Sequence, residues 1–236
     1  MSDKEYWLRV KLLLHEQHQD LQDVDGLGSC FFICMARAMF GNDDLHLDLR
    51  KLSVKPLRDP EILRFLEKCL TQECGLADED VIEEEKRLIL QNVVDRGQLE
   101  SKDTWETYLD KFALSPSMYA ESYHLASLMA LFNVEIKVYY TSPTKPTSLH
   151  WVTYQAKQVP EYVRTELGKI VKEFGPHIMS NKPLIELAKS RNHYQLVVPL
   201  KQRMIQGLSL SLSLSLCHTH THTYTLSLTH TFIFLY

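Results

Sequence analysis

The sequence lacks the features that direct a chain into or across a membrane. It has no run of 18 consecutive apolar residues, and its first residues, MSDKE, do not form a basic segment followed by an apolar core. We therefore predict neither a transmembrane helix nor a secretory signal, and we expect no membrane partner. The expected location is intracellular, in the cytoplasm, with the nucleus as an open alternative.

An excess of basic charge and a disulfide framework are also missing. The 26 Lys and Arg residues against 30 Asp and Glu give a net charge of -4, and the basic residues are scattered, so we expect no nucleic-acid partner. Five cysteines at irregular spacing are typical of a reducing compartment. Cys30 and Cys34 have the spacing of half a zinc site, but no second pair follows.

The most informative stretch present is residues 23–40, in which two glycines and a serine precede an apolar run. Gly26 and Gly28 permit a positive φ, and Ser29 is a favoured helix N-cap, so a helix is predicted to begin at Cys30. Backbone N–H groups at a helix start favour a thiolate and can bind an oxyanion. Cys30 is therefore a candidate nucleophile, the alternative being an inert core thiol, the role that we assign to Cys34.

The remaining chain alternates between helical and strand patterns. A buried helix that leads directly into a strand implies a layered α/β or α+β core. Residues 43–59 are predicted to be a connecting loop because they are polar and contain a proline. Helices are predicted over 6–18, 60–74, 78–92, 104–112, 119–132 and 160–174, a short helical turn over 183–190, and strands over 134–140, 149–154 and 195–200.

His193 lies where a polar loop becomes the last predicted strand. Such a position fixes the backbone while the ring can face a cleft, which makes His193 a candidate base, although a packed core histidine is the alternative. After Gly207 the composition changes to Ser-Leu and His-Thr repeats, which CT and CA dinucleotide repeats encode. Such a segment lacks the varied side-chain sizes that a core requires. We predict one domain over residues 1–205 and a disordered, low-complexity tail over 206–236.

Three segments together resemble the OTU (ovarian tumour) family of cysteine-type deubiquitinases. Residues 25–32 read DGLGSCFF, close to the family's DGDG(N/S)C(L/F)F; residues 125–139 read LASLMALFNVEIKVY; and His193-Tyr194 stands near the end of the domain. The resemblance spans roughly residues 5–200. It implies an α+β, papain-like fold in which helices flank a small central sheet.

The resemblance also implies a function. Cys30 would attack the carbonyl of the ubiquitin C-terminal glycine and His193 would act as the base, while the backbone N–H groups of Leu27, Gly28, Ser29 and Cys30 would form the oxyanion hole. The expected partners are ubiquitin or ubiquitinated proteins. No metal or other cofactor is required, and we expect a monomer.

Two positions depart from the family pattern. Leu27 stands where members commonly have Asp, and Gln195 where they commonly have Asp or Asn, two residues after the histidine. Gln195 can offer a neutral oxygen to orient the imidazole, but no negative charge. We therefore expect weakened activity, and the alternative is a catalytically inactive OTU-like module that binds ubiquitin or another partner.

Overall fold

A computed structural model describes residues 2–24, 28–74, 86–91, 104–111, 113–142, 145–175, 184–190 and 193–200. Within these ranges no helix has both the length and the apolar character needed to cross a bilayer. The predicted domain boundary at residues 205 and 206 lies outside them and stays a prediction. The helix predicted over 78–92 is described only at residues 86–91, which are helical.

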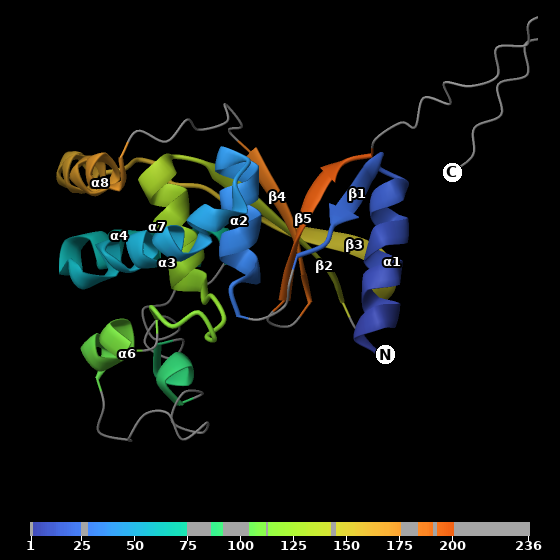
Figure 1. The fold of residues 1–236 in the computed structure, drawn as a ribbon, viewed down its shortest axis with the longest axis horizontal. Coiled ribbons are helices and arrows are strands. Elements are labelled where there is room, and N and C mark those ends of the chain that lie inside the picture. The colour runs from blue at the N-terminus through green and yellow to red at the C-terminus, as the bar shows by residue number, and fades with distance from the viewer. Residues whose placement is uncertain are drawn as a thin grey trace, which may run out of the picture. The chain divides into compact units, whose positions relative to one another are not determined.

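Helices and strands follow one another in a mixed order (Figure 1). The elements are α1 (Asp3–His15), β1 (Gln19–Gln22), α2 (Cys30–Phe40), η1 (Asp43–Leu45), α3 (His46–Val54), η2 (Pro56–Arg58), α4 (Pro60–Cys74), α6 (Trp105–Lys111), α7 (Ser122–Phe132), β2 (Glu135–Ser142), β3 (Lys145–Tyr154), α8 (Glu161–Phe174), β4 (Leu184–Ser190) and β5 (His193–Pro199).

One five-stranded sheet divides the helices into two groups. Its strand order is β1-β5-β4-β2-β3, in which β2 and β4 are parallel and every other pair is antiparallel. Helix α1 covers one face, while α2, α3, α4, α7 and α8 lie on the other side (Figure 1). The predicted α+β class, with helices flanking a small central sheet, is confirmed.

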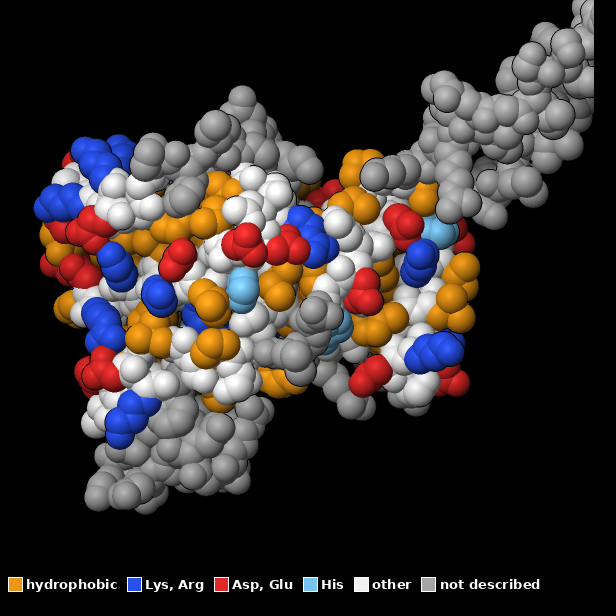
Figure 2. All heavy atoms as spheres, viewed as in Figure 1, with side chains coloured by type: hydrophobic (Ala, Val, Ile, Leu, Met, Phe, Trp, Pro, Cys, Tyr) orange, Lys and Arg blue, Asp and Glu red, His pale blue; other side chains and the backbone are white. Residues whose placement is uncertain are grey.

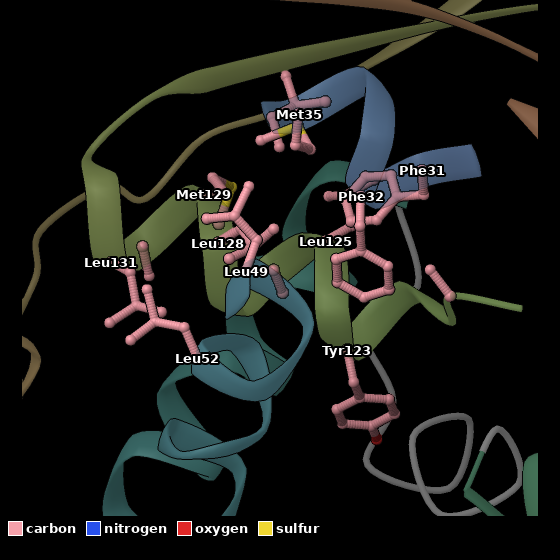
Figure 3. Packing of buried hydrophobic residues seen from close by; sticks show 14 of the residues in the cluster. Phe31, Phe32, Met35, Leu49, Leu52, Tyr123, Leu125, Leu128, Met129 and Leu131 are labelled. Atoms are coloured by element: carbon pink, nitrogen blue, oxygen red, sulfur yellow. The ribbon is translucent and has the colours of Figure 1, made fainter. Parts of the chain in front are cut away.

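The sheet separates two hydrophobic clusters of unequal size. The larger cluster joins the sheet to α2, α3 and α7, where Phe31, Phe32 and Met35 of α2 face apolar side chains of the two other helices (Figure 3). The smaller cluster lies beneath α1 and includes Val10, Leu14 and Val197. Helix α2, whose first residue is Cys30, is thus held on the side away from α1.

Side chains of β5 alternate between these two clusters. Tyr194 and Leu196 belong to the larger cluster, and Val197 belongs to the smaller one. Because successive strand residues point to opposite faces, His193 and Gln195 lie on the same face as Val197, toward α1. The face that carries His193 is therefore fixed by the register of the strand.

Two local predictions are wrong and one strand was not predicted, and tertiary contacts explain why. Residues 184–190 form β4 instead of a helical turn, because they pair with both β2 and β5. The predicted loop at 43–59 contains α3, whose Leu49, Leu52 and Val54 are buried. The short strand β1 was not predicted; only its pairing with β5 defines it.

Charges of both signs are interspersed on the described surface that Figure 2 shows. Blue and red side chains alternate over this face, and no large area of one sign is visible among its coloured residues. A nucleic-acid backbone requires a continuous basic stripe. The expectation that this chain does not bind nucleic acid stays a prediction.

His124 of α7 is a buried neutral imidazole, and this gives a testable pH dependence. It is fully buried, its Nδ1 accepts a hydrogen bond from the Glu121 N–H at 3.1 Å, and its ring meets Phe32 edge-on at 5.4 Å. Burial, with the positive charge of Arg50 as a smaller cause, lowers the pKa of His124 to about 3. The folded state therefore binds fewer protons than the unfolded chain below about pH 6.5.

We expect the free energy of unfolding to fall as the pH drops from about 6.5 toward 3, by up to about 1.4 kcal/mol per pH unit from His124 alone. His124→Asn keeps an acceptor near the Nδ1 position and removes this titration. Urea unfolding at pH 7.5, 6.5 and 5.5 should therefore show a shallower pH dependence for the variant. Equal slopes for both proteins would contradict the assignment.

Candidate active site

Cys30 is the first residue of α2, as predicted, but its helix start is fixed differently from the prediction. Ser29 occupies the N-cap position without a side-chain capping hydrogen bond. Its hydroxyl instead donates to the Pro116 carbonyl at 3.2 Å. The helix start is thus tied to the segment that precedes α7.

Gly28 makes this attachment sterically feasible. Its φ is +85°, and a Cβ at this position would lie 2.6 Å from the Pro116 carbonyl oxygen and 2.7 Å from the Ser117 carbonyl carbon. Both contacts are with backbone, which cannot rotate away as a side chain can. The close approach of residues 116–117 to position 28 therefore requires glycine.

Arg50 of α3 connects the same segments from inside the protein. Its side chain is fully buried, and its guanidinium donates to the carbonyls of Gly28 at 2.9 Å, Ala113 at 3.2 Å and Met118 at 2.6 Å. The guanidinium also lies over the Phe32 ring, 4.3 Å from its centroid. Burial lowers the pKa of Arg50 to about 10, so it remains charged at neutral pH.

The sulfur of Cys30 meets the beginning of β5. The Tyr194 N–H donates to Cys30 Sγ at 3.4 Å. Strand β1 pairs with β5 only from Leu196 onward, and β4 occupies the opposite edge. On the β1 side of the strand, the Tyr194 N–H therefore has the Cys30 sulfur as its partner, in the position where a longer β1 would supply a carbonyl.

The His193 ring is half-buried beside α1. It meets the Trp7 ring edge-on, with 5.5 Å between centroids, and its buried Nδ1 has no hydrogen-bond partner among the described residues. Burial lowers the pKa of His193, while the charges of Asp23 and Asp3 act in the opposite direction. The ring is therefore neutral at pH 7 and can accept a proton.

Burial has the opposite effect on the thiol. It raises the pKa of Cys30, and the N–H groups of Tyr194, Phe31 and Cys30 itself offset only part of that change. The resting pair is thus a thiol and a neutral imidazole. Cys30 is 1% exposed, so a substrate carbonyl can reach the sulfur only after the atoms that cover it move.

Gln195 lies on the same face as His193, and its amide has a charged partner. Gln195 Nε2 donates to Asp23 Oδ1 at 2.9 Å. Asp23 directly follows β1, one residue beyond the pair Gln22–Leu196. The side chain that sequence reasoning assigned to orienting the imidazole is therefore linked to a carboxylate.

The structure thus brings Cys30 and His193 to one edge of β5, with Gln195 nearby. Gly28 and Ser29 lie directly before Cys30, whereas Leu27 lies outside the described residues. The oxyanion hole expected from the backbone N–H groups of residues 27–30 therefore stays a prediction.

The sequence did not point to Arg50, Asp23 or Trp7 as residues of the site. None of the three belongs to a sequence motif that would indicate such a role. Among the described residues, no group of three His, Cys, Asp or Glu side chains could hold a metal ion.

Two glycines with left-handed backbones offer a matched test of the close packing around Gly28. Gly41, the C-cap of α2, has φ +67° and open space where a Cβ would lie, whereas Gly28 has φ +85° and no space. Gly41→Ala should cost about 1 kcal/mol from backbone strain alone, and Gly28→Ala at least about 3 kcal/mol because steric overlap adds to the strain. Urea unfolding of both variants measures the difference, and equal losses would refute the packing described for Gly28.

The raised pKa of the thiol predicts how Cys30 reacts with a small alkylating reagent. Because burial favours the thiol over the thiolate, the rate of reaction with iodoacetamide should rise with a midpoint above about pH 8.5, the value of a free cysteine. Mass spectrometry of the peptide that contains Cys30 measures this rate. A midpoint below that of a free cysteine would mean that a thiolate–imidazolium pair exists at rest.

Comparison with known proteins finds similarity in structure only. No family model and no curated protein matches the chain. The solved structure of the OTUD1 OTU domain is 15% identical, with a TM-score of 0.49, over 84% of this chain and 99% of that one. The viral OTU domain protease from Farallon virus is 14% identical, with a TM-score of 0.44, over 78% of this chain and 85% of that one. Both matched chains are OTU domains by name.

Proposed function

We propose that this chain is an OTU-like cysteine-type deubiquitinase that hydrolyses the peptide or isopeptide bond after the C-terminal glycine of ubiquitin. The observation that carries the proposal is the 3.4 Å hydrogen bond from the Tyr194 N–H to Cys30 Sγ. It places a thiol at a helix start beside a strand that begins with a histidine. A nucleophile next to a base is the arrangement that acyl transfer requires.

The reaction proceeds in two stages at these groups. The thiol proton of Cys30 passes to the His193 ring as the sulfur bonds to the glycine carbonyl carbon. The C–N bond then breaks, and His193 returns that proton to the leaving amine. In the second stage water gives a proton to His193 and attacks the thioester, the S–C bond breaks, and the sulfur regains its proton.

A catalytically inactive ubiquitin- or partner-binding module is the second candidate, and one observation favours it. Cys30 is 1% exposed and burial raises its pKa, so neither access nor ionisation favours attack in the resting structure. The deubiquitinase proposal accommodates this burial only if ubiquitin binding opens the site. The two candidates therefore differ in what happens when ubiquitin is present.

A ubiquitin with a C-terminal vinyl electrophile tests the proposal, with a known OTU enzyme as the positive control. The full chain should form one covalent adduct at Cys30 and should cleave di-ubiquitin, and Cys30→Ala should abolish both. Cys34→Ala is the matched control, because Cys34 is a fully buried cysteine one turn later in α2 and should leave labelling intact. Ubiquitin binding with neither labelling nor cleavage would establish the second candidate instead.

A further inference from the structure

Asp23 and Gln195 form a cross-strand pair at the point where β1 ends. The register of β1 and β5 pairs Gln22 with Leu196, so continuing it by one residue places Asp23 opposite Gln195. The hydrogen bond of 2.9 Å between Gln195 Nε2 and Asp23 Oδ1 confirms this placement. The pair lies on the face of β5 that carries His193.

The carboxylate and its backbone are both held in place. Asp23 Oδ1 also accepts a hydrogen bond from the Val24 N–H at 3.0 Å, and the Asp23 carbonyl accepts one from Arg37 Nη1 at 3.1 Å. Arg37 is fixed in turn by its ion pair with Asp43. The carboxylate of Asp23 is therefore held in a defined position at this edge of the sheet.

This contact determines how the Gln195 amide is oriented. An ionised carboxylate only accepts hydrogen bonds, so the amide atom facing Asp23 must be the nitrogen. The carbonyl oxygen Oε1 then remains as an acceptor for another donor. Gln195 is 8% exposed, so few waters compete for that oxygen.

His193 is the titratable group that this charge affects. The charges of two carboxylates raise the pKa of His193 against the effect of burial. Asp23 has the larger effect, and Asp3 at the start of α1 has the smaller one. The Trp7 ring of α1 packs against the imidazole and carries no charge. The Asp23 carboxylate thus supplies a negative charge on the face of the sheet that carries the imidazole, although the side chain at position 195 is neutral.

We propose that Asp23 is a positioning residue for His193 that acts through Gln195 and replaces the orienting carboxylate that position 195 lacks. The proposal rests on the proposed deubiquitinase function. When the Cys30 proton moves to His193, both ring nitrogens become donors. In the resting structure the buried Nδ1 of His193 has no hydrogen-bond partner among the described residues, so the bond from the ring to Gln195 Oε1 has to form as the ring becomes charged. Asp23 then stabilises that charge through the polarised amide.

Asp23→Asn is the first test, because it removes the charge and preserves the shape. The value of kcat should fall by about 10-fold or more with little change in KM, as for the loss of one charge-assisted hydrogen bond in the transition state. The acid limb of the kcat/KM profile should also move to lower pH, because the imidazolium loses a stabilising charge. A purely structural role would leave that limb in place.

The reciprocal exchange of the two groups separates charge from folding defects. Gln195→Glu alone sets two carboxylates face to face and should also lower kcat. The double variant Asp23→Asn with Gln195→Glu restores the hydrogen bond with the charge on the other partner, and kcat should return to within about 3-fold of the original chain. A double variant that is no more active than either single variant would overturn the proposal.

Asp3→Asn is the matched control, since Asp3 also raises the pKa of His193. It should move the acid limb slightly and leave kcat unchanged. If the original chain neither reacts with the ubiquitin electrophile nor cleaves di-ubiquitin, the proposed function fails. NMR titration of the His193 ring then still tests whether Asp23 acts on His193. A His193 pKa that is lower in Asp23→Asn supports the link, and an identical pKa in both proteins refutes it.

Discussion

The early end of the β1–β5 pairing is the constraint on which the site depends. Pairing stops at Gln22 and Leu196, three residues after β5 begins at His193, so the first residues of β5 have an open edge. A strand N–H that is buried on such an edge needs a partner within the protein, because water cannot reach it. The Tyr194 N–H finds one in Cys30 Sγ, and this contact places the thiol against the start of β5, where His193 lies.

The interior guanidinium of Arg50 supports this arrangement at a large desolvation cost. No described carboxylate forms an ion pair with it; it binds three backbone carbonyls and the face of Phe32. These contacts offset part of the cost of burying a charge. In return they fix the Gly28 carbonyl relative to the carbonyls of Ala113 and Met118. Gly28 lies two residues before the thiol, so these bonds also hold the backbone that leads into Cys30.

The sequence predicted the places of Cys30 and His193 better than it predicted the residues that hold them there. Cys30 at a helix start and His193 at a strand start could be read from glycines, apolar spacing and the change from polar to β-branched residues, all of which are local signals. Arg50 could not, because an arginine in a polar stretch has the same pattern whether it faces solvent or three carbonyls. Asp23 could not either, since its role depends on the register between β1 and β5, which only the folded sheet defines. Residues 184–190 were misread for the same reason, because their pairing with β2 and β5 overrides local preference.

The central claim is that the Cys30 thiol and the His193 imidazole share one site, and a bifunctional alkylating reagent tests it most directly. 1,3-Dibromoacetone first alkylates a thiol and then bridges it to a nucleophile within a few bonds' reach. Treatment of the full chain, followed by digestion and mass spectrometry, should yield one cross-linked peptide pair that joins Cys30 to His193, with both bromides lost. A single adduct on Cys30 with His193 unmodified, or a bridge from Cys30 to another residue, would contradict the account.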